Sequence, residues 1–354
     1  MLKKLFGLIL LFTVSQAFSQ ITGVVKDKNG TPLPYVNIYT ETGSKGTTTN
    51  DDGIYELKID EKGSYTLVFQ FLGYKTQKKQ IDAEDFPVKV DVTLIAESTS
   101  LDEVTVESGE NPANRIIRKA IELREINAKK LESFTADFYS RGLWRIKNAP
   151  EKILGQDVGD LGGGLDSTRS GIVYLSETIS KIAFQKPDDF KEKIIASKVS
   201  GDDNGFSLNS AQEAYFSFYE NTLEINSEII SPIAQYAFNY YRYKLEGTFF
   251  DDQGNMINKI RVTPKRKGDR IFSGYIYIDE DLWQIYGIEL TTTGTAIQVP
   301  PIEEIVFLQN YKYSEENSLY IQISQSVDFS FKMFGFSGNG KFTAVYSDYN
   351  FKPD

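Results

Sequence analysis

The chain has 354 residues, enough for two domains with separate cores, and its formal net charge of -10 argues against nucleic acid, whose phosphates require a basic face. Histidine and cysteine are both absent, which excludes disulfides, the usual zinc ligands, cysteine nucleophiles and histidine bases, so we expect no cofactor, no metal site and no enzyme. Aromatic residues make up 13% of the sequence and predict a mainly β protein with a few helices.

The N-terminus has the pattern of an export signal. Two lysines precede an apolar run at residues 5–14, and small side chains stand at Ala17 and Ser19. This predicts a signal peptide over residues 1–19, cleaved before Gln20. The mature chain is then expected in the periplasm or on the periplasmic face of the outer membrane; a short membrane anchor is the alternative.

Short alternating apolar runs follow at regular spacing and predict a seven-stranded β-sandwich over residues 20–96. The segments ITGVVKDKNGTPLPYVNIY, GTTTNDDGIYEL and FLGYKT resemble the carboxypeptidase-regulatory-like domain, a transthyretin-like sandwich that opens many Gram-negative outer-membrane proteins. Residues 50–53, Asn-Asp-Asp-Gly, lack the spacing of a calcium loop and predict a turn. The expected strands are 21–25, 36–39, 46–49, 54–59, 65–71, 74–81 and 88–94.

Residues 97–110 are expected to form a linker. Within it, residues 101–106 resemble the segment that follows this sandwich in TonB-dependent receptors, so a fragment of such a receptor is one interpretation. The chain then departs from that pattern, because Asn111 and Pro112 predict the start of a helix running to Asn127. Its basic residues are expected on a solvated face, or alternatively on a face that binds a partner; they are Arg115, Arg118, Lys119 and Arg124.

Residues 111–354 are expected to form an α+β domain with a large antiparallel, half-barrel-like sheet. Strands are predicted at residues 171–175 and 179–183, and a helix at residues 211–223. The blocks NPANRIIRKAIELRE, FTADFYSRGLWRI and SPIAQYAFNYYRYKLEGTFFDDQG resemble a domain of unknown function that is found between this sandwich and an outer-membrane barrel. The relatives imply that a barrel would begin near residue 354.

A β-meander is predicted at residues 257–290, where three strand-like runs are joined by a basic turn and an acidic turn. Tyr275 and Tyr277 alternate with Ile276 and Ile278, so this part of the sheet is apolar on both faces. The meander resembles the sheet of periplasmic carriers that sort lipoproteins to the outer membrane, a half-barrel around an apolar cavity.

A long antiparallel hairpin is predicted at the end of the chain. Residues 319–333 alternate apolar and polar, and only Gln325 breaks the alternation. A turn is expected at Gly338-Asn339-Gly340.

Six side chains are predicted to line an apolar ligand-binding face of the second domain: Tyr275, Tyr277, Trp283, Ile285, Phe329 and Phe331. The helix stripe is narrow beside them, so something else must cover this surface. Either the chain's own residues 234–243 cover it, or an acyl chain or partner segment does.

The favoured function is a non-catalytic envelope protein that binds or scaffolds, as the periplasmic part or a truncated relative of an outer-membrane barrel protein. The alternatives are a soluble periplasmic carrier of lipid or lipoprotein acyl chains, and the receptor fragment named above. A hydrolase would need a carboxylate pair such as Asp279 with Asp281, or Asp251 with Asp252. These pairs are expected in solvated turns, so no catalytic residue is assigned.

Overall fold

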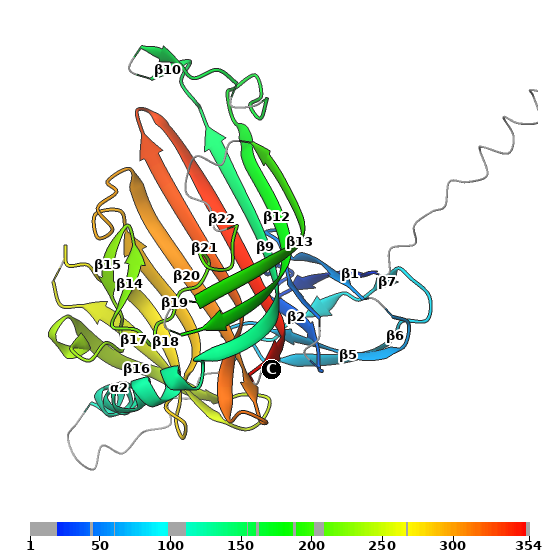
Figure 1. The fold of residues 1–354 in the computed structure, drawn as a ribbon, viewed down its shortest axis with the longest axis vertical. Coiled ribbons are helices and arrows are strands. Elements are labelled where there is room, and N and C mark those ends of the chain that lie inside the picture. The colour runs from blue at the N-terminus through cyan, green and yellow to red at the C-terminus, as the bar shows by residue number, and fades with distance from the viewer. Residues whose placement is uncertain are drawn as a thin grey trace, which may run out of the picture. The chain divides into compact units, whose positions relative to one another are not determined.

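The structure is a computed structural model, and among its described residues it is mostly strand with one α-helix, which confirms the predicted fold class (Figure 1). The predicted signal peptide and residues 98–110 of the predicted linker lie outside the described part. The chain separates into two compact units, one reaching Ile95 without residues 71–76, and the other formed by those residues and by everything from Ala96 onward. The described residues are 20–42, 45–59, 61–97, 111–153, 155–160, 163–186, 189–201, 209–266 and 268–351.

The first unit contains two small sheets, as a β-sandwich requires. One sheet has the order β4-β1-β7, with β8 also on β1, and the other has the order β3-β2-β5-β6. All seven predicted strands are present, and the last is divided into β7 and β8. The rings of Tyr55 and Phe69, one from each sheet, lie 5.7 Å apart in the core. The strands are β1 (Gln20–Lys26), β2 (Asn37–Thr40), β3 (Gly46–Thr48), β4 (Ile54–Lys58), β5 (Ser64–Gln70), β6 (Gln77–Asp82), β7 (Val88–Lys89) and β8 (Val92–Thr93).

The predicted turn before β4 is confirmed. Asn50 Oδ1 accepts hydrogen bonds from the backbone N–H groups of Asp52 and Ile54, both at 3.0 Å. Gly53 has φ +70°, and a Cβ there would lie 2.4 Å from the carbonyl oxygen of Val25. The Asn50 carboxamide therefore provides the hydrogen bonds that the backbone of the turn needs, as predicted.

The second unit is built on one ten-stranded antiparallel sheet, of order β13-β12-β9-β22-β21-β20-β19-β18-β17-β16 (Figure 1). The large strands are β9 (Ser133–Lys147), β12 (Gly171–Gln185), β13 (Asp189–Gly201), β16 (Tyr241–Phe250), β17 (Met256–Pro264), β18 (Ser273–Asp279), β19 (Ile285–Thr293), β20 (Ile302–Ser314), β21 (Leu319–Met333) and β22 (Phe336–Asn350). The small elements are β10 (Lys152–Ile153), β11 (Gln156–Asp157), β14 (Thr222–Ile225), β15 (Ser227–Ile230) and the 3-10 helix η1 (Ala237–Asn239). The meander corresponds to β17, β18 and β19, and the two strands predicted between residues 171 and 183 form the single strand β12.

Helix α2 (Pro112–Lys129) begins where the sequence predicted. Asn111 Oδ1 accepts a hydrogen bond from the N–H of Ala113 at 3.0 Å, and Pro112 is the first helical residue. The expectation of a wholly solvated basic face is wrong for Arg124, which is 6% exposed and hydrogen-bonds the side chain of Asn221.

Two predicted elements are wrong. Residues 211–223 do not form a helix; they consist of turns and extended segments, and the carbonyl oxygens of Ala214 and Phe216 bond to side chains of the sheet. The turn expected at Gly338-Asn339-Gly340 lies inside β22, and the chain reverses at Phe334-Gly335. The two glycines of that motif lie opposite aromatic rings: a Cβ at Gly338 would be 2.4 Å from Phe331, and one at Gly340 would be 2.1 Å from Phe329.

Candidate functional site

One row of directly opposed residues crosses the whole ten-stranded sheet. Opposed residues on neighbouring strands share a face, so this row defines one face, which we call the covered face. Its chemistry changes across the sheet from aliphatic to amide to small and hydroxyl-bearing side chains. In strand order from β16 to β13, the row is Leu245, Ile260, Ile276, Ile288, Gln309, Gln325, Ala344, Ser140, Thr178 and Ser197.

Residues 209–219, which we call the cover segment, lie on this face. Phe216 packs edge-on against Phe307 of β20, with ring centroids 5.3 Å apart. Phe218 lies 5.3 Å from Phe272, and the hydroxyl oxygen of Tyr219 accepts a hydrogen bond from the N–H of Ile285 at 2.9 Å. The cover segment thus closes part of the sheet with the chain's own aromatic side chains.

Two glutamines hold the cover segment to the sheet. Gln309 donates through Nε2 to the carbonyl oxygen of Phe216 at 2.7 Å and to Oε1 of Gln325 at 2.6 Å. Gln325 donates through Nε2 to the carbonyl oxygen of Ala214 at 2.7 Å, and Tyr311 donates its hydroxyl to Oε1 of Gln309 at 2.8 Å. Both glutamines are almost fully buried, at 0% and 2% exposed. A connected buried network of this kind fixes one arrangement of the chain.

The start of the cover segment is held by hydroxyl groups of β9 and β12. The Asn209 side chain accepts a hydrogen bond from Ser176 Oγ at 2.6 Å, and its amide hydrogen-bonds the hydroxyl of Tyr174. Glu192 of β13 accepts from Ser180 Oγ at 2.6 Å and from the N–H of Ala211 at 3.0 Å. The polar part of the covered face is therefore used to bind the chain itself.

An aromatic cluster occupies the covered face beyond the cover segment. The Trp144 ring lies edge-on to Phe329 at 4.9 Å, and Phe329 stacks with Phe342 at 6.3 Å. Tyr174 and Phe331 complete the cluster. Trp144 and Phe331 are partly exposed, and no described residue accepts a hydrogen bond from the buried Trp144 Nε1. Trp144 and Phe331 therefore give this cluster an accessible apolar surface.

The structure divides the six predicted ligand-binding residues. Phe329 and Phe331 belong to the aromatic cluster, and Ile285 lies on the covered face opposite Ile278. Trp283 lies in the turn before β19 with φ +56°, and the Arg115 guanidinium lies 5.4 Å from its ring centroid. The six side chains therefore do not form one surface, and their role in ligand binding stays a prediction.

Tyr275 and Tyr277 lie on the opposite face of the sheet. They alternate with Ile276, and their cross-strand neighbours are the cations Arg261 and Lys259. The Lys259 Nζ lies 4.3 Å from the Tyr275 ring centroid, and the Arg261 guanidinium carbon lies 4.8 Å from it. Cation–π contacts thus surround Tyr275, whereas Tyr277 is 1% exposed and packs edge-on against Phe249. These two tyrosines do not share the covered face with Phe329, and their role in ligand binding stays a prediction.

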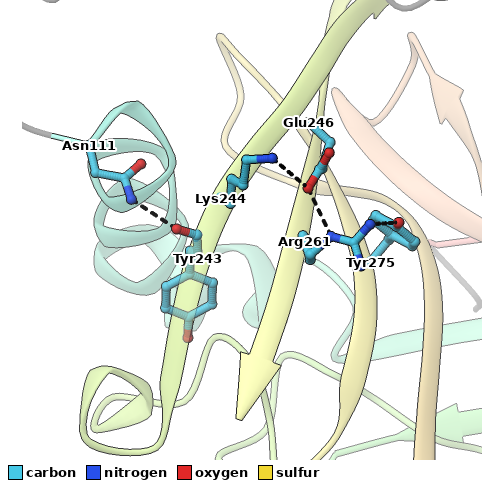
Figure 2. Close-up of polar contacts among 6 residues, drawn as sticks. All are labelled: Asn111, Tyr243, Lys244, Glu246, Arg261 and Tyr275. Atoms are coloured by element: carbon cyan, nitrogen blue, oxygen red, sulfur yellow. Dashed lines mark hydrogen bonds and ion pairs between the residues drawn. The ribbon is translucent and has the colours of Figure 1, made fainter. Parts of the chain in front are cut away.

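Figure 2 shows the charged surroundings of Tyr275. Glu246 accepts hydrogen bonds from Arg261 Nε at 2.8 Å and from Lys244 Nζ at 3.3 Å, and Arg261 also hydrogen-bonds the Tyr275 hydroxyl. Hydrogen bonding to Arg261 lowers the pKa of the Glu246 carboxyl. In the same view, the Asn111 amide donates to the carbonyl oxygen of Tyr243 at 2.8 Å, which joins the start of α2 to β16.

Asp279 is buried, contrary to the expectation of a solvated turn. It is 2% exposed, and its Oδ1 accepts from the N–H groups of Asp281 at 2.9 Å and Leu282 at 2.6 Å. The hydroxyl of Tyr320, itself fully buried, lies 3.1 Å from Asp279 Oδ2 and 3.3 Å from Asp251 Oδ2. Burial raises the pKa of Asp279. Asp279, Tyr320 and Asp251 thereby link the β18–β19, β20–β21 and β16–β17 hairpins of the sheet.

The sequence interpretation missed Gln309, Trp144 and the cover segment. Gln325 could have been recognised from the sequence, because it alone places a polar side chain on the apolar face of an alternating strand. Gly338 and Gly340 were a second indication, because glycines at alternate positions of a strand leave room for aromatic rings to lie across it.

Among the described residues, no group of three or more acidic, His or Cys side chains could hold a metal ion. In the same residues, none of the helices has the length and apolar character of a membrane span.

These features define a class of protein: a small β-sandwich followed by a ten-stranded antiparallel sheet that is partly closed by its own chain. By sequence, the chain belongs to the Family of unknown function (DUF5686), which matches residues 116–349. Residues 21–106 match the CarboxypepD_reg-like domain. Both predicted resemblances are thereby confirmed.

Similarity to curated proteins covers about a quarter of the chain. TonB-dependent receptor P39 of Formosa agariphila is 39% identical over 97 residues, which are 27% of this chain and 9% of that receptor. TonB-dependent receptor SusC of Bacteroides thetaiotaomicron is 33% identical over 99 residues, again 27% of this chain and 9% of the receptor. The chain thus matches about a tenth of the length of these relatives.

Solved structures give weak matches. A putative outer membrane lipoprotein-sorting protein domain from Vibrio parahaemolyticus has 10% identity and a TM-score of 0.24, covering 66% of this chain and 92% of that one. A LolA superfamily protein from Nitrosomonas europaea has 12% identity and a TM-score of 0.22, covering 68% and 94%.

Proposed function

We propose that this chain is a non-catalytic cell-envelope protein that binds or scaffolds other envelope components from the periplasmic side of the outer membrane. The match of residues 21–106 to the domain found in TonB-dependent receptors supports an envelope location. The expected partner is an outer-membrane barrel or another envelope protein. The proposal covers a barrel in the same polypeptide and a barrel formed by a separate protein.

The observation that favours a scaffold is the amide network of the covered face. Gln309 donates to the carbonyl oxygen of Phe216 and to Oε1 of Gln325, and Gln325 donates to the carbonyl oxygen of Ala214. To admit a lipid, this face would have to break these buried hydrogen bonds. Each polar group left unpaired would cost about 1–3 kcal/mol. The sheet in this region therefore serves as a fixed surface.

Cell fractionation with protease treatment tests the location. Intact cells should protect the chain from added protease, and permeabilising the outer membrane should expose it. Photo-crosslinking from the opposite face, with the crosslinker at Thr263, should then capture an outer-membrane protein. Recovery in the cytoplasm, or no envelope protein crosslinked from Thr263, would contradict the proposal.

The aromatic cluster favours a second function, the carriage of an acyl chain. Trp144 and Phe331 are partly exposed beside buried rings, and the Trp144 N–H lacks an acceptor among the described residues. A fluorescent fatty acid should bind with a stoichiometry near one if this function holds, and Trp144→Ala should abolish the binding. Unchanged binding in Trp144→Ala would place the probe elsewhere.

A further inference from the structure

The tip of the β21–β22 hairpin has an unusual residue. The chain reverses through Phe334 and Gly335, with φ values of +49° and +85°. Two left-handed residues define a type I′ turn, which favours Asn or Asp before Gly. A bulky side chain in this conformation is strained, so Phe at this position is less favourable for folding than Asn.

The Phe334 ring does not recover that strain by packing. It is 63% exposed, and it forms no ring contact in the described part of the chain. Trp283, another aromatic residue with positive φ, is different, because its ring lies beneath the Arg115 guanidinium. An exposed aromatic ring held in a strained position indicates a contact outside this chain.

Cations lie just behind the tip. Lys332 and Lys147 stand on either side of Ser337 in one cross-strand row, and both are exposed. Neither forms an ion pair with a described residue. The row is two residues from Phe334, which corresponds to about 7 Å along a strand. On β20, the nearest acidic residues by register are Glu303, in the bulge next to Phe331, and Glu304, opposite Ser330.

This spacing matches the surface layer of a bilayer. The headgroup layer is roughly 5–8 Å thick on each side of the hydrocarbon core. An aromatic ring that reaches the acyl boundary would therefore leave the two lysines at the depth of the lipid phosphates. Both strands of the hairpin have 15 residues, and Figure 1 shows the hairpin running to the top of the sheet.

We propose that the β21–β22 hairpin tip docks on an anionic lipid surface, with the Phe334 ring inserted at the acyl boundary and Lys332 and Lys147 on headgroup phosphates. The insertion is shallow and reversible, because it involves one ring and two charges. A protein partner is the competing occupant. The lysine row behind a single apolar tip favours the lipid surface, since a protein interface requires a larger buried area.

Vesicle flotation tests this docking on the full chain. The probe is a vesicle of phosphatidylethanolamine and phosphatidylglycerol at about 3:1, and the reference is phosphatidylcholine. Phe334→Asn removes the ring and suits the left-handed backbone, so the hairpin stays folded. It should lower binding to the anionic vesicles about tenfold. The double change Lys332→Gln with Lys147→Gln should lower binding to anionic vesicles by a similar factor, and high salt should remove that difference.

Phe250→Asn is the matched control. Phe250 is 64% exposed and ends β16, at the opposite end of the sheet. All variants share the same N-terminus, so the apolar run at residues 5–14 contributes equally. As a second measurement, emission from Phe334→Trp should shift to the blue with anionic vesicles, and emission from Phe250→Trp should not.

The outcomes separate the two occupants. If Phe334→Asn binds as tightly as the unmodified chain, or if Phe250→Asn loses as much binding, the proposal is overturned. An unshifted Phe334→Trp emission with bound vesicles also overturns it, and would assign the exposed ring to a protein contact.

Discussion

Replacing Gln325 with Met tests whether the amide network holds the cover segment on the sheet. Met has a similar volume, so the change removes hydrogen bonds without leaving a large cavity. The carbonyl oxygen of Ala214 and one N–H of Gln309 lose their partner, and both lie in a region where Gln325 is 2% exposed. Each buried unpaired group costs about 1–3 kcal/mol, so the second unit should lose about 2–6 kcal/mol of stability.

Tryptophan fluorescence during urea unfolding measures this loss. The chain has two tryptophans, Trp144 and Trp283, and both belong to the second unit, so the signal reports that unit alone. Hydrogen exchange adds a local measurement: amides of residues 211–219 should exchange at least about 30-fold faster, which corresponds to 2 kcal/mol.

Gln322→Met is the matched control. Gln322 lies on the same strand and is only partly buried, and its amide is 3.5 Å from Gln325 Oε1, at the limit of a hydrogen bond. It should change stability by less than about 0.5 kcal/mol. A stability change in the same small range for Gln325→Met, with unchanged exchange of the cover segment, would show that the network does not hold this segment on the sheet.

Three further predictions follow from the packing. Gly340→Ala should destabilise the second unit by about 2 kcal/mol or more, because the new Cβ would lie 2.1 Å from the buried Phe329 ring; urea unfolding checks this, and an unchanged midpoint would contradict it. Burial raises the pKa of Asp279 above its usual 3.8, so the folded state binds this proton more tightly than the unfolded state does. Stability therefore falls as the pH rises from 3.8 through the higher pKa of the folded state. Asp279→Asn should remove this slope in unfolding experiments between pH 4 and pH 7, and an identical slope would contradict it. Residues 20–96 should fold alone, and a collapsed amide spectrum of that fragment would count against it.

The strands were predictable because alternation at period two is a local property. Residues 319–333 and the 257–290 meander show it directly, and turn-forming residues such as Asn50 satisfy their own backbone. The Pro112 helix start was predictable for the same reason, since its cap uses a side chain that is adjacent in sequence. None of these features depends on a distant part of the chain.

The failures all depended on distant contacts. Residues 211–223 have helical spacing, but Gln309 and Gln325, about a hundred residues later, bond their carbonyl oxygens. Glycines 338 and 340 permit aromatic rings to lie across β22, which local sequence cannot distinguish from a turn. For Tyr275, both faces of its strand are apolar, so only the cross-strand register and the cover segment determine which face is closed.

If the sheet is a fixed surface closed by its own chain, its covered face has no room for a bound lipid. Native mass spectrometry of protein purified from the envelope tests this, with delipidation and lipid add-back as the control. We expect the mass of the chain alone before and after delipidation, and no stoichiometric uptake on add-back. A lipid that copurifies at one per chain, leaves on delipidation and returns on add-back would contradict it.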